Sequence, residues 1–155
     1  MAHIVKMTIQ DRHNVIKYAY NLPSTLQTYF PFFSQFLGLF EFTPEEEKEY
    51  GIQIADGEIK SNCPEKTFDI DIDQVPEGIR AAIRMRVTDL KAEMKKLRDS
   101  NKGNDSFKDS PLFVAMVDNL SKLLTKEEIA ETEPEFQEKK KAEAEKKPIF
   151  KLIKR

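Results

Sequence analysis

Cysteine, tryptophan, glycine and long apolar runs are scarce or absent in this 155-residue sequence. Cys63 is the single cysteine, which excludes an internal disulfide and leaves no CxxC pair for zinc or redox chemistry. The five glycines form no phosphate-binding loop. No stretch reaches the roughly 18 apolar residues of a membrane-spanning helix, and the N-terminus has no apolar run typical of a signal peptide. We therefore expect a soluble, cytoplasmic protein that does not bind membranes.

Signatures of catalysis are also missing. The two histidines, His3 and His13, stand ten residues apart and show neither metal-ligand spacing nor a pattern for general-base catalysis. No GxSxG motif marks a nucleophilic serine. We predict a protein without catalytic residues, cofactor or small-molecule substrate. An active site assembled from scattered residues stays open as an alternative, because spacing along the chain does not test it.

Three aspartates at alternate positions, Asp69, Asp71 and Asp73, come nearest to a chemical site. Side chains two apart on a strand share a face and can hold a divalent cation together. The spacing matches the opening of a calcium loop, but Gln74 replaces the glycine and Arg80 replaces the glutamate that the loop requires. We therefore interpret the aspartates as charges on an exposed strand face and predict no metal site.

The net charge of -2 conceals five alternating blocks. Residues 1–40 carry +2, residues 41–78 carry -9, residues 79–103 carry +5, residues 104–137 carry -5 and residues 138–155 carry +5. Such blocks pair within a fold or between chains, and each exposed ion pair contributes only about 0 to 1 kcal/mol. We expect charge to select partners more than to stabilise the fold.

The sequence predicts one long helix from Pro76 to Asp99. Its apolar residues recur at steps of four and three, which places them in one stripe suited to a helix-helix seam. A second helix that starts at Ser110-Pro111 has a broad apolar face and is predicted to pack antiparallel against this stripe. The stripe consists of Ile83, Val87, Leu90, Met94 and Leu97, and the second face runs from Phe113 to Leu124.

The remaining predicted elements are short. Alternation of apolar and polar residues indicates strands, Asp-Gly indicates a tight hairpin turn, and threonine followed by glutamate three residues later indicates a helix start. These rules predict a strand at 4–9, a helix from a cap at Asp11 to about Leu22, a helix capped by Thr43, a hairpin at Asp56-Gly57, a strand at 67–73 and a helix capped by Thr125.

Residues 29–42 hold the densest apolar patch, with six phenylalanines and Tyr29. The patch fits a helix buried in the core, and it also fits an exposed aromatic surface for a protein partner. The candidates for partner contact are Phe32, Phe33, Phe36 and Phe40.

The composition changes at residue 131, after which the chain is charged and almost free of apolar residues until PIFKLIKR. This arm is predicted to be a solvated helix or flexible. Its end is either a last strand or turn that docks on the chain itself or a docking peptide for another protein. The candidate contacts are the apolar Ile149, Phe150, Leu152 and Ile153 and the cationic Lys151, Lys154 and Arg155.

Together these patterns predict an α+β fold, with a globular domain at 1–130 and a charged C-terminal arm at 131–155. A small, mostly antiparallel sheet would be packed by two or three helices. We expect a non-catalytic interaction or assembly protein that binds a protein partner, either itself as an oligomer or another chain. The alternative is a nucleic-acid-associated protein that uses the basic helix 79–102 and the basic arm, with Arg80, Arg84 and Arg86 facing phosphates or an acidic partner.

The run from Glu41 to Leu97 contains, in order, TPEEEKEYGI, the Asp56-Gly57 hairpin, the strand TFDIDID and a helix ending in DLKAEMKKL. This order resembles a module of small, uncharacterised proteins encoded by tailed bacteriophages. The resemblance covers a little over a third of the chain and carries over no functional residue. It implies a phage accessory protein that acts in the host cytoplasm or the virion, in assembly or by binding a host protein.

Overall fold

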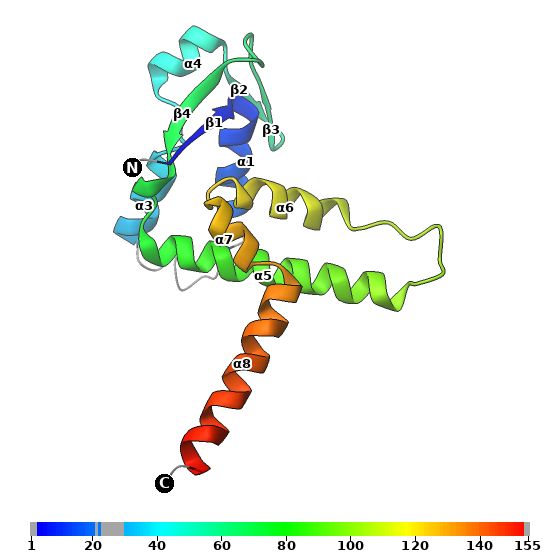
Figure 1. Ribbon diagram of the computed structural model, residues 1–155. Coiled ribbons are helices and arrows are strands. Elements are labelled where there is room, and N and C mark those ends of the chain that lie inside the picture. The colour runs from blue at the N-terminus through cyan, green and yellow to red at the C-terminus, as the bar shows by residue number, and fades with distance from the viewer. Residues whose placement is uncertain (1–2, 21, 23–29, 154–155) are drawn as a thin grey trace.

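The fold belongs to the predicted α+β class (Figure 1). The computed structural model describes residues 3–20, 22 and 30–153, with side chains described at 3–20, 22 and 32–144. None of the helices within these residues is long and apolar enough to cross a membrane. The elements are β1 (Ile4–Thr8), α1 (Ile9–Ala19), α3 (Phe30–Gly38), α4 (Pro44–Tyr50), β2 (Gln53–Ala55), β3 (Glu58–Lys60), β4 (Thr67–Asp71), the 3-10 helix η1 (Ile72–Gln74), α5 (Glu77–Ser100), α6 (Pro111–Ser121), α7 (Lys126–Glu131) and α8 (Pro134–Ile153).

The described strands form two separate antiparallel pairs. β1 pairs with β4, so that the first strand of the chain meets a strand some 60 residues later, and Lys6 lies opposite Asp69. β2 and β3 form the hairpin predicted from Asp-Gly. Asp56 and Gly57 have φ angles of 54° and 76°, and these left-handed values are those that a two-residue hairpin turn requires.

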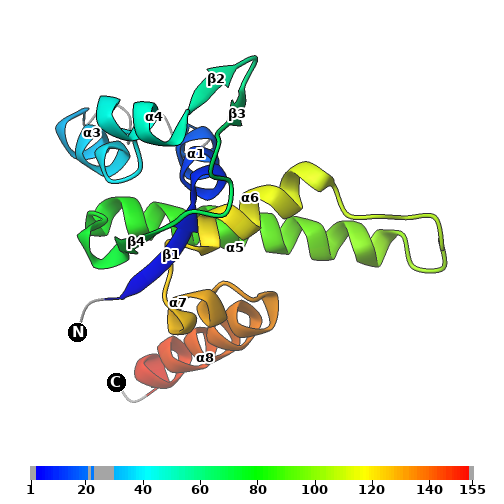
Figure 2. The ribbon, with the colours of Figure 1, turned by 90° about the horizontal axis from the view of Figure 1, so that it is seen from above.

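The long helix and its antiparallel partner are confirmed. α5 and α6 lie side by side and are joined by a loop at one end (Figures 1 and 2). Ile83 and Val87 are fully buried in the seam, and Leu120 of α6 is buried beside them in the same core. Leu97 is 37% exposed, so the buried stripe ends at Met94, nearly two turns before the helix ends at Ser100.

Several predicted boundaries differ from the structure by a few residues, and α1 ends at Ala19 instead of about Leu22. The helix after β1 is capped by Thr8, whose hydroxyl accepts a hydrogen bond from the Asp11 N–H, while the Asp11 carboxylate accepts one from the Thr8 N–H. Asp11 is therefore at position N3 of a capping box, the third residue of the helix, and is not the N-cap. The strand expected at 67–73 ends at Asp71 because η1 starts at Ile72. The caps at Thr43 and Thr125 are confirmed as capping boxes.

The early end of β4 separates the three alternating aspartates. Asp73 leaves the strand and accepts hydrogen bonds from the backbone N–H of His3 and from its ring, with 2.8 Å between Nδ1 and Oδ1. The His3 hydrogen bond lowers the pKa of Asp73. Asp71 caps η1 by accepting a hydrogen bond from the Asp73 N–H. Only Asp69 and Asp71 therefore remain on the strand.

The phenylalanine-rich segment forms α3 and the turn after it, and most of its described rings are buried. Phe36 and Phe40 are fully buried, and Phe33 is 5% exposed. Their rings follow one another at centroid distances of 6.0 and 5.5 Å. These three residues therefore belong to the core, as one of the two interpretations predicted. They do not form an exposed aromatic surface, because a buried side chain cannot contact a partner. Phe32 alone among the four candidates is exposed, at 58%.

Candidate interaction surface

α8 extends away from the rest of the protein (Figure 1). None of its described side chains, at 134–144, is buried, and the one large apolar residue among them, Phe136, is 41% exposed. A helix in the interior of a domain buries an apolar stripe. The described part of α8 has none, so burial of this helix contributes little to the stability of the fold.

Polar contacts with α5 hold the start of α8. Lys91 of α5 donates hydrogen bonds from Nζ to the Thr132 hydroxyl, at 2.8 Å, and to the Glu133 carboxylate, at 2.9 Å. Thr132 is 1% exposed and donates its own hydroxyl to the carbonyl oxygen of Ile129. This buried threonine fixes the point at which α8 leaves the body.

A second ion pair lies one turn further along α5. The Lys95 ammonium is 3.1 Å from the Glu138 carboxylate, and this hydrogen bond raises the pKa of Lys95. The Lys95 side chain is 37% exposed and that of Glu138 is 71% exposed, so the pair contributes little to stability.

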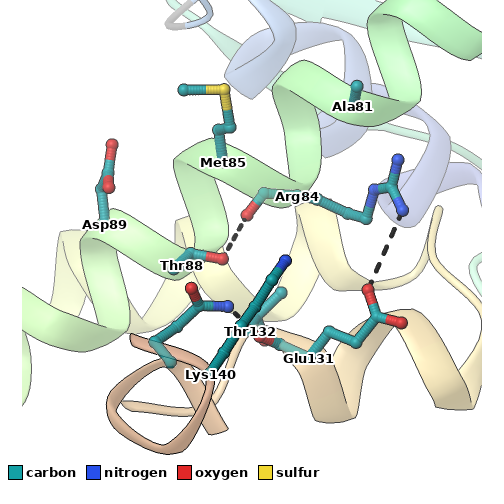
Figure 3. A pocket seen from close by; sticks show the side chains of 9 residues that line it. Ala81, Arg84, Met85, Thr88, Asp89, Glu131, Thr132 and Lys140 are labelled. Carbon is teal, nitrogen blue, oxygen red and sulfur yellow. Dashed lines mark hydrogen bonds and ion pairs between the residues drawn. The ribbon is translucent and has the colours of Figure 1, made fainter. Parts of the chain in front are cut away.

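Open grooves flank the place where the start of α8 lies against α5. The first, of about 470 Å³, lies between α5, α7 and the start of α8 (Figure 3). A second, of about 390 Å³, continues on the other side of Thr88 and Gln137, which line both. The first groove is lined by Ala81, Arg84, Met85, Thr88, Asp89, Glu131, Thr132, Gln137 and Lys140.

The polar groups of the first groove contact one another. The Arg84 guanidinium points toward the Glu131 carboxylate, and the Thr88 hydroxyl donates a 2.7 Å hydrogen bond to the carbonyl oxygen of Arg84 (Figure 3). Met85 also lines this groove, and its side chain is apolar. The residue is 67% exposed. The groove therefore has a mostly polar lining with an exposed apolar side chain at Met85.

Two of the three arginines predicted to face phosphates or an acidic partner, Arg80 and Arg84, contact acidic residues of this chain. Arg80 is only 9% exposed and lies 3.4 Å from Glu128 of α7 and 3.7 Å from Asp73. Arg84 lies 3.6 Å from Glu128. The expectation that Arg80 is a solvent-facing contact needs correction, because its position on α5 turns it toward α7 and η1. Most of their ion pairs are with residues of α7. The sequence predicted this helix but not its pairing with the arginines of α5.

Arg86 is half-buried, and its buried Nε has no hydrogen-bond partner. Within the described side chains no acidic residue forms an ion pair with it. The lack of an acidic partner among the described side chains distinguishes Arg86 from Arg80 and Arg84.

The candidates at the end of the chain lie outside the described side chains. The backbone of α8 is helical up to Ile153. The side chains of Ile149, Phe150, Lys151, Leu152 and Ile153 are not among those described, and Lys154 and Arg155 lie outside the described residues altogether.

Sequence reasoning missed the residues that join α8 to the body, above all Lys91, Thr132 and Glu133. The sequence did carry a signal for the start of α8, because Pro134 suits the first turn of a helix. It also carried a weaker signal for the contact, because a lysine on the basic helix can pair with an acidic residue. The pairing itself depends on how α7 folds back over α5, which no local pattern indicates.

Within the described side chains, no group of three or more His, Cys, Asp or Glu residues lies together as in a metal centre. Comparisons with protein-family models, with curated proteins and with solved structures gave no match.

Proposed function

We propose that the protein is a non-catalytic interaction or assembly protein that uses α8 and the adjoining grooves on α5 to bind another protein. One observation carries this proposal: a 20-residue helix projects from the body and none of its side chains described at 134–144 is buried. Ordering a segment costs conformational entropy, and burial normally offsets that cost. In α8 a partner would provide the burial.

The sequence of α8 supports a protein partner. Its first half is charged, and its last turns carry the apolar residues Ile149, Phe150, Leu152 and Ile153 among lysines. Residues three and four apart share a face of a helix, so a helix that ends this way presents an apolar patch with a cationic rim. Helices of this kind bind by laying the apolar patch in a partner's groove. The phage resemblance makes a virion protein or a host protein the proposed partner.

Deletion of residues 148–155 tests this function. We expect an unchanged melting temperature together with lost partner binding, because the deleted turns contact the partner and not the core. A large fall in melting temperature would instead mean that the segment docks on its own chain. Size-exclusion chromatography with light scattering then identifies the partner class: a stable oligomer at low and moderate salt indicates a second copy, and a monomer indicates a different protein.

Nucleic acid is the second candidate because some cations remain without acidic partners. Lys96 on α5 and Lys139, Lys140 and Lys141 on α8 are exposed and form no ion pair with a described residue. Exposed lysines of this kind neutralise phosphates in a salt-dependent way. A gel shift at low salt with DNA and with RNA tests this candidate, and the absence of any complex would remove it.

A further inference from the structure

The β1–β4 sheet has only two strands, and its hydrogen-bond pattern shows which backbone groups are left at its edges. The Ile72 N–H donates to the carbonyl oxygen of His3, at 3.0 Å, so these two residues form a hydrogen-bonded pair at the end of the sheet. Antiparallel strands alternate hydrogen-bonded and non-hydrogen-bonded pairs. Counting along the register makes Lys6 and Asp69 a non-hydrogen-bonded pair.

The N–H and C=O of Asp69 therefore point away from β1, toward the free edge of β4. The same alternation turns the backbone groups of Thr67 and Asp71 outward. Among the described residues no other strand pairs with this edge, and no hydrogen bond to the backbone of Asp69 comes from outside the sheet. Thr67 and Asp69 are also exposed. An edge of this kind is a template for an additional strand.

Charge restricts what can occupy the edge. Asp69 and Asp71 lie on one face of β4, and neither forms an ion pair with a described residue. Pairing β4 with β4 of a second copy would place Asp69 opposite Asp69 in the central register, and like charges directly opposite one another destabilise a sheet. A strand with cations at alternate positions would instead place them opposite the two carboxylates.

We propose that the free edge of β4 binds an extended segment of a partner protein that has Lys or Arg at alternate positions and apolar residues between them. The strand adds main-chain hydrogen bonds at Thr67, Asp69 and Asp71, and its cations face the two aspartates. Its apolar residues face the side of the sheet that holds Phe68 and Ile70. This inference rests on the proposed function only in requiring a protein partner, because β4 lies in the body and not in α8.

Titration of the full chain, labelled with ¹⁵N, with the capped peptide TVKVKVT tests the proposal. We expect the largest amide shift changes at residues 67–71. A peptide with glutamates in place of the lysines is the charge control, and a TVKVKVT peptide with N-methylated alternate amides is the backbone control. Both should bind at least about tenfold more weakly, since one places like charges across the pair and the other removes the edge hydrogen bonds.

Protein variants separate the charge of this edge from acidity in general. The double variant Asp69→Asn and Asp71→Asn should bind the lysine peptide TVKVKVT about five- to tenfold more weakly than the native chain does. The matched variant Glu45→Gln and Glu49→Gln removes the same charge from exposed positions on α4 and should leave the affinity unchanged. Asparagine keeps a side-chain oxygen, so the substituted side chain at position 71 can still cap η1.

Several results would overturn the proposal. The first is that the lysine peptide does not bind at about 1 mM, and the second is that the control peptides bind as tightly as it does. The third is that the amide shift changes are concentrated on α4. Amide protection of residues 67–71 that dilution removes would show a second copy on the edge, which also contradicts it. The full chain keeps α8 throughout, so failure here leaves the function proposed for α8 to its own test.

Discussion

The Nη1 of Arg12 donates a hydrogen bond of 3.0 Å to the Oε2 of Glu46, and this pair joins α1 to the first turn of α4. Arg12 is only 4% exposed. Its Nε donates to the carbonyl oxygen of Phe40, at 3.1 Å, and its guanidinium carbon lies 4.2 Å from the ring centre of Phe42 and 4.6 Å from that of Phe68. One buried cation thus connects α1, the end of the phenylalanine-rich segment, α4 and β4.

Replacing this cation should be costly. We expect Arg12→Leu to lower the free energy of unfolding by about 3 kcal/mol, because the carbonyl of Phe40 loses its donor and Glu46 loses its partner. For a domain of this size that corresponds to a fall in melting temperature of roughly 6 to 12 °C. Urea and thermal unfolding measure both quantities.

Arg98→Leu is the matched control for Arg12→Leu. Arg98 also pairs with a carboxylate, at 2.6 Å from Asp109, but its side chain is 54% exposed. We expect a loss of less than about 1 kcal/mol. Equal effects of the two substitutions would show that burial of Arg12 does not matter.

Glu46 should make stability depend on pH. The hydrogen bond from Arg12 lowers the pKa of Glu46 below its ordinary value of 4.5. A carboxyl group whose pKa is lower in the folded state stabilises the fold above its unfolded pKa and loses this contribution as the pH falls through the folded value. We therefore expect the free energy of unfolding of the native chain to exceed that of Glu46→Gln at about pH 7. This difference should disappear toward about pH 3. A constant difference across that range would contradict this assignment.

Much of the fold is predictable because the signals are local. The α5 stripe, the Asp-Gly turn and the capping boxes at Thr43 and Thr125 depend on residues within a few positions of one another. Arg12 gave no such signal, since an arginine in an amphipathic helix normally lies on the solvent face. Its burial depends on rings and carbonyls that lie about 30 to 55 residues further along the chain. Among the candidate residues, burial of Phe33, Phe36 and Phe40 was one of two interpretations that composition alone could not separate.

Gly51 ends α4 in a conformation that only glycine adopts easily. Its φ is +61°, and a Cβ at this position would collide with the side-chain amide of Asn62. We expect Gly51→Ala to destabilise the fold by roughly 1 to 3 kcal/mol in urea unfolding. Gly78→Ala is the control: Gly78 lies in α5 with open space around it, so this change should be neutral or stabilising by up to about 1 kcal/mol. A neutral Gly51→Ala would contradict the assigned turn.

Removal of α8 should leave the fold intact. A chain that ends at Glu133 loses no described buried side chain and one exposed ion pair, Lys95 with Glu138. We expect its melting temperature to fall by less than about 3 °C. A chain that ends at Leu124 is the control, because it also loses the buried Thr132 and the Glu128 partner of Arg80, and it should melt at a clearly lower temperature. Similar large losses for both truncations would mean that α8 is part of the fold.

The claim that α8 binds another protein is tested most directly by quantitative affinity capture with the full chain and with the chain that ends at Glu133. Both are incubated with lysate of the source cells at moderate salt, to which a separately tagged second copy has been added. The predicted result is that the full chain captures one protein, or the second copy. The truncated, folded chain should capture at least about tenfold less of that protein. Identical sets of proteins retained by the two chains would contradict the claim.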